Sequence, residues 1–205
     1  MLKQIWEVLN SKIVVLLIAF VLTTVVGAYI NDRYQRATWQ REKRFELLSR
    51  RLDEGTKFIE NLSELMNKRF FRLQRLLWIA ESGDRSSFNQ MWDEYYESVI
   101  EWNYKLNTNR NRIERLAGQE TAIFFLDFQD ETRPQNPESI HGRFKLAHDR
   151  LLRVRKSFLA NSKNLTETIK EAYAALSRLD IEIDAFILSL NQILIETEEK
   201  MEMTS

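Results

Sequence analysis

The sequence has no cysteine, only two histidines, two prolines and five glycines among 205 residues. Without cysteine there is no thiol nucleophile, no disulfide and no thiolate metal site. His141 and His148 lie seven residues apart, too far along one helix to chelate a single ion, and we expect surface or helix-capping positions for both. The five glycines stand singly, so no glycine-rich phosphate loop is present. With no catalytic, cofactor-binding or metal residues to name, the sequence predicts a protein that is not an enzyme.

Residues 13–30, IVVLLIAFVLTTVVGAYI, form an uncharged run of eighteen in a chain that is 29% charged. As a helix the run is ~27 Å long, close to the ~30 Å hydrocarbon core of a bilayer. The alternative is a cleaved secretory signal with its cleavage site near Val26–Ala28. Glu7 and Trp6 in the preceding segment, and the length of the run, favour an anchor. We therefore predict an N-terminal flank at 1–12 and a transmembrane helix at 13–30.

Basic residues are unequally distributed around this span. Lys3 and Lys12 precede it, whereas six follow within twenty residues: Arg33, Arg36, Arg41, Lys43, Arg44 and Arg50. The positive-inside rule then places the N-terminus outside and the body in the cytoplasm. The expected location is the cell (inner) membrane, crossed once, with the lipid bilayer as a partner.

The body, residues 31–199, shows helical periodicity almost throughout. Apolar residues recur at spacings of three and four from Phe45 to Ala80, and with strict four–three spacing from Phe88 to Leu116, interrupted only by Asn109. The sequence predicts an all-α fold, in which one N-terminal transmembrane helix precedes a long antiparallel helical bundle or coiled-coil rod. The expected helices span about 31–82, 84–130 and 139–199, followed by a frayed tail at 200–205.

Two breaks in the body are clear and a third is open. Gly83 followed by Asp84 is typical of a helix end and a new N-cap, and Pro134 and Pro137 mark a loop. The apolar stripe slips by one position at 161–164, either as a stutter in one long helix or as a turn. The absence of glycine and proline there favours continuity, which gives three long helices; a turn would give four.

Charge is segregated within a chain of zero net charge. In an antiparallel pair, Lys68, Arg69, Arg72 and Arg75 would face Asp93, Glu94, Glu97 and Glu101. Other basic residues would form a membrane-proximal collar, attracted by anionic lipid: Arg33, Arg36, Arg41, Lys43, Arg44, Arg143 and Lys145. The alternative is ordinary solvated helix faces whose exposed ion pairs contribute little. Basic residues near aromatics at 69–78 fit a bundle core and its rim, so no nucleic acid partner is expected.

Two further surfaces are candidates for contact. Ala19, Thr23 and Gly27 recur every four residues in the span and form a small-residue face on which two copies of the chain could pack into a homo-oligomer. Phe124, Phe125, Leu126 and Phe128 form a cluster before the proline loop that contacts the membrane or a partner, or closes the end of the core.

Taken as a whole, the sequence favours a single-pass, membrane-anchored helical scaffold or sensor that binds protein partners through a cytoplasmic coiled-coil-like rod. The alternative is a helical bundle on the outer face of the membrane that senses a ligand and signals through a partner.

Overall fold

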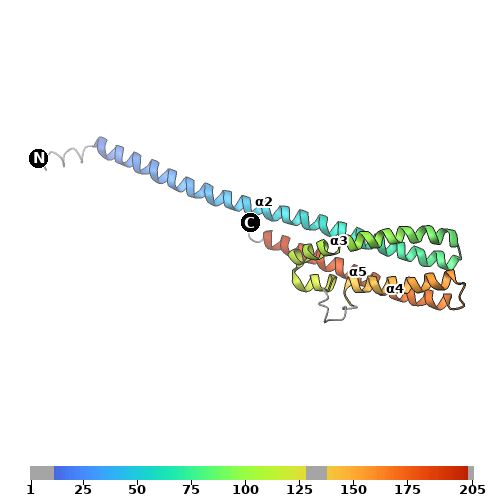
Figure 1. Cartoon of the computed structure of the whole chain (residues 1–205). Helices are drawn as coiled ribbons and strands as arrows, with labels where there is room; N and C mark the ends of the chain where they lie inside the picture. The colour runs from blue at the N-terminus through green and yellow to red at the C-terminus, as the bar shows by residue number, and fades with distance from the viewer. Residues whose placement is uncertain (1–11, 128–137, 203–205) are drawn as a thin grey trace. The chain divides into compact units, whose positions relative to one another are not determined.

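The computed structural model describes residues 12–127 and 138–202, and over these ranges the chain is helical, with four helices and no strand. The helices are α2 (Lys12–Ser82), α3 (Arg85–Phe125), α4 (Ile140–Leu159) and α5 (Leu165–Glu202) (Figure 1). Residues 52–200 form one compact unit, and residues up to Arg51 belong to a second. Helix α2 contributes its first part to the second unit and its remainder to the compact one. The all-α prediction is confirmed.

The first part of α2 holds the apolar run. It is the only segment in the described ranges that is long and apolar enough to cross a membrane, and none of its most apolar stretch is buried. Thr23 and Thr24 donate hydrogen bonds from their hydroxyls to the carbonyls of Ala19 and Phe20, at 2.7 and 2.8 Å. The two hydroxyls are therefore satisfied within the helix and do not need water.

The turn between α2 and α3 forms as the sequence predicts. Gly83 adopts φ 78°, a left-handed conformation that glycine accepts without steric cost. Asp84 is the N-cap of α3, and its carboxylate accepts a hydrogen bond from the backbone N–H of Ser87 at 3.1 Å. The hydrogen bonds from Ser87 lower the pKa of the Asp84 carboxyl, which keeps the cap charged.

The favoured continuity of the 139–199 segment is wrong, because a turn at residues 160–164 divides it into α4 and α5. Asn161 adopts φ 52°, and the N–H groups of Asn161 and Ser162 donate to the carbonyls of Phe158 and Ser157. These two hydrogen bonds, together with a left-handed residue just after the helix, end α4 without a glycine. Asparagine is the residue other than glycine that adopts this conformation most readily, and it was the signal to follow.

Helix α3 also ends earlier than the predicted 130. Its last residue is Phe125, and Leu126 is already extended at φ −146° and ψ 107°, although its N–H still bonds to the carbonyl of Ala122. The extended backbone at Leu126 leaves its side chain buried, at 7% exposed. Gly118 interrupts the helix before this point with φ 86° and ψ 172°, where the apolar period weakens in the sequence.

Within the compact unit each helix contacts the next along the chain, and α5 contacts α2 (Figure 1). The contacts are Lys68–Glu101 and Arg72–Glu94 between α2 and α3, and Tyr95–His148 and Trp102–His141 between α3 and α4. Between α4 and α5 they are Arg143–Glu182 and Arg150–Glu171. Between α2 and α5 they are Glu81–Tyr173 and the close approach of Leu194 to Gly55.

The core of the compact unit consists of the predicted apolar stripes and their neighbours. Leu73, Tyr95 and Trp102 are fully buried, and Asn109 is 9% exposed at the polar position of the α3 stripe. Phe45, where the predicted α2 stripe begins, is instead 51% exposed and lies in the other unit. Burial begins near Gly55, whose missing Cβ would lie 2.8 Å from a methyl carbon of Leu194.

Candidate functional site

A buried arginine lies in the core of the compact unit. Arg69 of α2 is only 3% exposed, and among the described residues its Nε and Nη1 atoms have no hydrogen-bond partner. Its guanidinium carbon lies 4.6 Å from the ring centroid of Phe144 on α4 and 5.6 Å from that of Trp102 on α3. The two rings offer cation–π stabilisation, but they accept no strong hydrogen bonds from the guanidinium N–H groups. Arg69 is therefore a full positive charge held in an aromatic setting.

Both histidines of α4 bond to aromatic side chains of α3 beside this arginine. The indole Nε1 of Trp102 donates to Nδ1 of His141 at 3.1 Å, and the Tyr95 hydroxyl lies 2.8 Å from Nδ1 of His148. The rings of Trp102 and His141 are within 2° of parallel with centroids 6.5 Å apart, which is the geometry of an in-plane N–H···N bond rather than of a stack. Because an indole N–H can only donate, Nδ1 of His141 carries no proton.

The charges of this cluster, which we call the Arg69 cluster (Arg69, Tyr95, Trp102, His141, Phe144 and His148), follow from burial. Burial lowers the pKa of His141 to about 4, and the Arg69 and Lys145 charges act in the same direction. The pKa of His148 is lowered by burial and by Arg69, against the opposing effect of Asp149. Both imidazoles are neutral at pH 7, so the cluster carries a single fixed charge, that of Arg69.

Burial also acts on Arg69 and Tyr95 themselves. It lowers the pKa of the guanidinium and raises that of the Tyr95 phenol, while the interaction between the two groups opposes both shifts. An arginine side chain stays protonated in proteins, so the group remains a cation despite its burial.

The sequence interpretation of these residues was partly wrong. The histidines are neither surface nor capping residues, since each is half-buried and bonded to α3. The predicted pairing across α2 and α3 is confirmed for Lys68, which lies 2.8 Å from Glu101, and for Arg72, which lies 3.9 Å from Glu97. Arg69 makes no such pair, because it occupies a buried position of the apolar stripe. Its spacing of three from Met66 and four from Leu73 was the available signal.

A groove of about 280 Å³ lies between α2 and α3. Its lining on α2 ends at Lys68, the residue before Arg69. Its charged wall is largely neutralised by its own residues, because Glu101 bonds to both Lys105 at 2.7 Å and Lys68 at 2.8 Å. Hydrogen bonds from these two lysines lower the pKa of Glu101 to about 2. Glu101 and the two lysines therefore balance much of their own charge within the groove.

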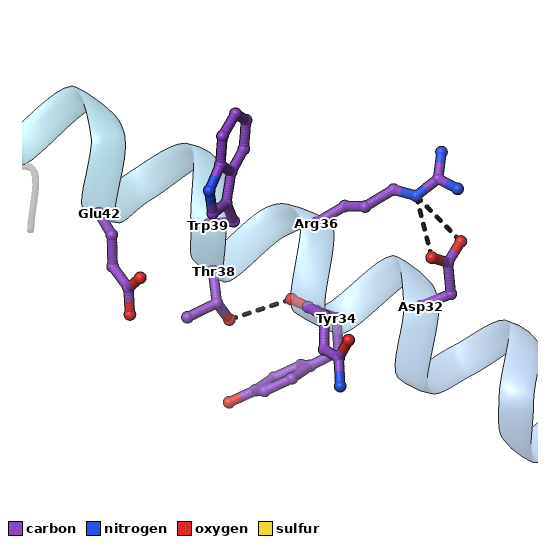
Figure 2. A pocket seen from close by; sticks show the side chains of 7 residues that line it. Asp32, Tyr34, Arg36, Thr38, Trp39 and Glu42 are labelled. Atoms are coloured by element: carbon purple, nitrogen blue, oxygen red, sulfur yellow. Dashed lines mark hydrogen bonds and ion pairs between the residues drawn. The ribbon is translucent and has the colours of Figure 1, made fainter.

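A surface of α2 outside the compact unit is drawn in Figure 2. Its side chains all leave one helix, with Arg36 bound to Asp32 and the Thr38 hydroxyl bound to the Tyr34 carbonyl at 3.0 Å. Every residue that lines this surface belongs to α2, so within the described residues it is a helix surface and not a cavity.

The predicted small-residue face lies on this part of α2. Ala19, Thr23 and Gly27 are all exposed, and no atom of the described residues lies within 4 Å of the position a Cβ of Gly27 would take. The face is thus open to another molecule over its whole length.

The predicted basic collar is divided between the two units. Arg33, Arg36, Arg41, Lys43 and Arg44 are exposed on α2 in one unit, whereas Arg143 and Lys145 lie on α4 in the other. Several of these charges are already paired: Arg36 with Asp32, Lys43 with Glu46 and Arg143 with Glu182.

The aromatic cluster at the end of α3 is partly inside the core. Phe125 is fully buried and Leu126 nearly so, whereas Phe124 is 42% exposed with its ring 5.9 Å from that of Phe186. Phe128 lies outside the described residues. Two of the three described members therefore help to close the core.

The chain matches no protein-family model, no curated protein and no solved structure.

Proposed function

We propose that this chain is a single-pass membrane protein whose helical body binds other proteins as a scaffold or sensor. The observation that carries the proposal is the exposure of the apolar run in α2, where Leu16 is 69% and Phe20 70% exposed. Apolar surface in water costs roughly 25 cal/mol per Å². A bilayer removes this cost along the whole run, whereas residues 52–200 already bury their own core.

The proposed body is an antiparallel four-helix bundle on the cytoplasmic side. The contacts between consecutive helices and between α5 and α2 support the antiparallel arrangement. The cytoplasmic side is supported by the six basic residues that follow the span, against two before it.

A helix of a partner protein is the proposed occupant of the outer face of α5. Ile181, Leu188 and Ile195 are 67%, 70% and 48% exposed and recur every seven residues. Seven-residue spacing keeps large side chains on one seam of a helix, which is how helices present themselves to one another in coiled coils. This face is a better candidate than the 124–126 cluster, of which only Phe124 is exposed.

Extraction of membranes at alkaline pH tests the anchor. The wild-type chain should stay in the pellet, and the double variant Leu17→Arg/Val21→Arg should move to the supernatant. Each arginine in mid-span costs ~2.5–3.5 kcal/mol of insertion. Leu47→Arg, at a position 61% exposed beyond the span, is the matched control and should stay in the pellet. Release of the wild-type chain would overturn the proposal.

Fusions at the C-terminus test the side on which the body lies. An alkaline phosphatase fusion should be inactive and a fluorescent-protein fusion bright. Active phosphatase would move the body to the outer face.

A photo-crosslinking residue at position 188 tests the α5 face. It should yield an adduct of defined mass in membranes, whereas the same residue at Lys170, also exposed on α5, should not. Equal labelling at both positions, or none at 188, would contradict partner binding through this face.

An outer-face ligand sensor is the second candidate, and the Arg69 cluster favours it. A buried charge without an ion-pair partner is costly, and binding sites are where such groups are retained. The fusion experiment distinguishes the two candidates.

A further inference from the structure

We propose that the Arg69 cluster is a binding site for a small monoanion with planar oxygen ligands, such as a short carboxylate or nitrate. The inference concerns the compact unit alone and holds on whichever side of the membrane that unit lies.

The positive charge of Arg69 is not balanced by a neighbouring carboxylate of the described residues. Arg69 is 97% buried, and within residues 12–127 and 138–202 no carboxylate forms an ion pair with it. Its neighbours at cation–π distance are the rings of Trp102 and Phe144, which do not neutralise it. Buried cations are ordinarily paired with an anion, because the loss of hydration is otherwise uncompensated. An anion next to the guanidinium would supply the missing partner.

The cluster also has an excess of hydrogen-bond donors over acceptors. The guanidinium has five N–H donors and no acceptor. Among the described residues the Tyr95 side chain is hydrogen-bonded to it, while its Nε and Nη1 atoms have no acceptor there. The Nδ1 atom of His141 is already used by the Trp102 indole, so the proton of the neutral ring is on Nε2, which is a further donor. Carboxylate and nitrate oxygens only accept, and a planar pair of oxygens fits a guanidinium through two parallel hydrogen bonds.

The neutral histidines and the flat aromatic rings of the cluster limit the charge and the size of the ligand. Since His141 and His148 are neutral, the cluster carries one positive charge, and a monoanion balances it. A dianion such as sulfate would leave one negative charge buried. The flat faces of Trp102 and Phe144 beside the guanidinium favour a planar group of few atoms.

Thermal unfolding of the purified full chain in detergent tests the site. Sodium acetate and sodium nitrate are each titrated against sodium chloride at constant ionic strength, with sodium sulfate as the dianion. We expect a saturable rise in melting temperature with acetate or nitrate and none with sulfate, because a ligand that binds only the folded state stabilises it by mass action.

Arg69→Met is the decisive variant, because the long, unbranched methionine side chain occupies similar space in the core without a charge. It should fold, melt no lower than the wild type in chloride, and lose the saturable response. Arg75→Met removes an exposed cation of the same helix and should respond like the wild type. If Arg69→Met does not fold, Arg69→Lys keeps the charge without the planar fork and should bind at least ~10-fold more weakly.

Several outcomes would overturn the proposal. If a water molecule satisfies the guanidinium, neither acetate nor nitrate will give a saturable shift. A shift of the same size in Arg69→Met, or a non-saturating rise common to all four salts, would likewise assign the effect to general salt action.

Discussion

The two parts of α2 use the same helical backbone with apolar residues in opposite ways. From residue 15 to 30 large apolar side chains surround the helix and stay exposed, as Leu16 at 69% shows. From Gly55 to Ala80 most of them occupy one stripe, in which Leu73, Leu76 and Leu77 are fully buried, although Phe71 and Trp78 stay about half exposed. A helix that is apolar all round needs an apolar solvent, whereas a striped helix needs only other helices. The arrangement of apolar residues, more than their number, therefore distinguishes the candidate membrane span from the core.

The largest test of this comparison uses a matched pair of tryptophans. Trp102 is fully buried in the compact unit and Trp39 is 59% exposed in the first part of α2. Trp102→Ala should lower the free energy of unfolding by ~3–5 kcal/mol, because it leaves a large cavity among aromatic rings. Trp39→Ala should change it by less than ~0.5 kcal/mol. Urea unfolding followed by circular dichroism measures both; similar losses would mean that the first part of α2 also packs on protein.

The second test uses pH, since only the compact unit contains histidine. The pKa of His141 falls from 6.5 to about 4 on folding, so its contribution is complete above pH 6.5. It is then lost as the pH falls from 6.5 to about 4, a total of roughly 3 kcal/mol, less what solvent screening removes. His141→Gln, whose amide oxygen can still accept from Trp102, should flatten the curve in this window.

His148→Gln is the control for this pH effect, because it leaves the His141 contribution in place. Its curve should keep most of the slope between pH 6.5 and 4. Parallel curves for the wild type and His141→Gln would contradict a neutral His141 in the folded state.

The third test compares two glycines of α2. A Cβ at Gly55 would lie 2.8 Å from Cδ2 of Leu194 and 3.4 Å from Cδ1 of Leu116, whereas Gly27 has no atom within 4 Å of that position. Gly55→Leu should overpack the core and cost ~1–3 kcal/mol. Gly27→Leu should leave urea unfolding of the compact unit unchanged. An equal loss in both variants would contradict the separation into open and packed parts.

Most of the fold could be predicted from the periodicity of apolar residues, because burial of one helix face requires a repeat near 3.6 residues. The apolar run, the helical stretch that ends at Ser82 and the Gly83–Asp84 turn could all be predicted from the sequence. The early end of α3 was not, because Leu126 is apolar and buried whether its backbone is helical or extended.

The Arg69 cluster was missed for a different reason. A basic residue next to Lys68 and Arg72 looks like part of an exposed face, although Arg69 occupies a stripe position. The roles of His141 and His148 depend on hydrogen-bond partners from α3, 39 and 53 residues away in the sequence, and no local pattern records that approach. Long-range hydrogen bonds are the part of this structure that one sequence does not reveal.

The smallest test concerns the turn that divides α4 from α5, where the sequence analysis favoured one helix. Asn161 has φ 52°, a conformation that costs an ordinary L-residue ~1–2 kcal/mol, and its side-chain oxygen accepts a hydrogen bond from Arg85 at 2.5 Å. Asn161→Ala should therefore lower the free energy of unfolding by ~1 kcal/mol in urea. Asn161→Gly loses the same hydrogen bond but accepts the backbone angle, so it should lose less. If alanine and glycine cost the same, the hydrogen bond to Arg85, and not the left-handed backbone, would be what holds this turn.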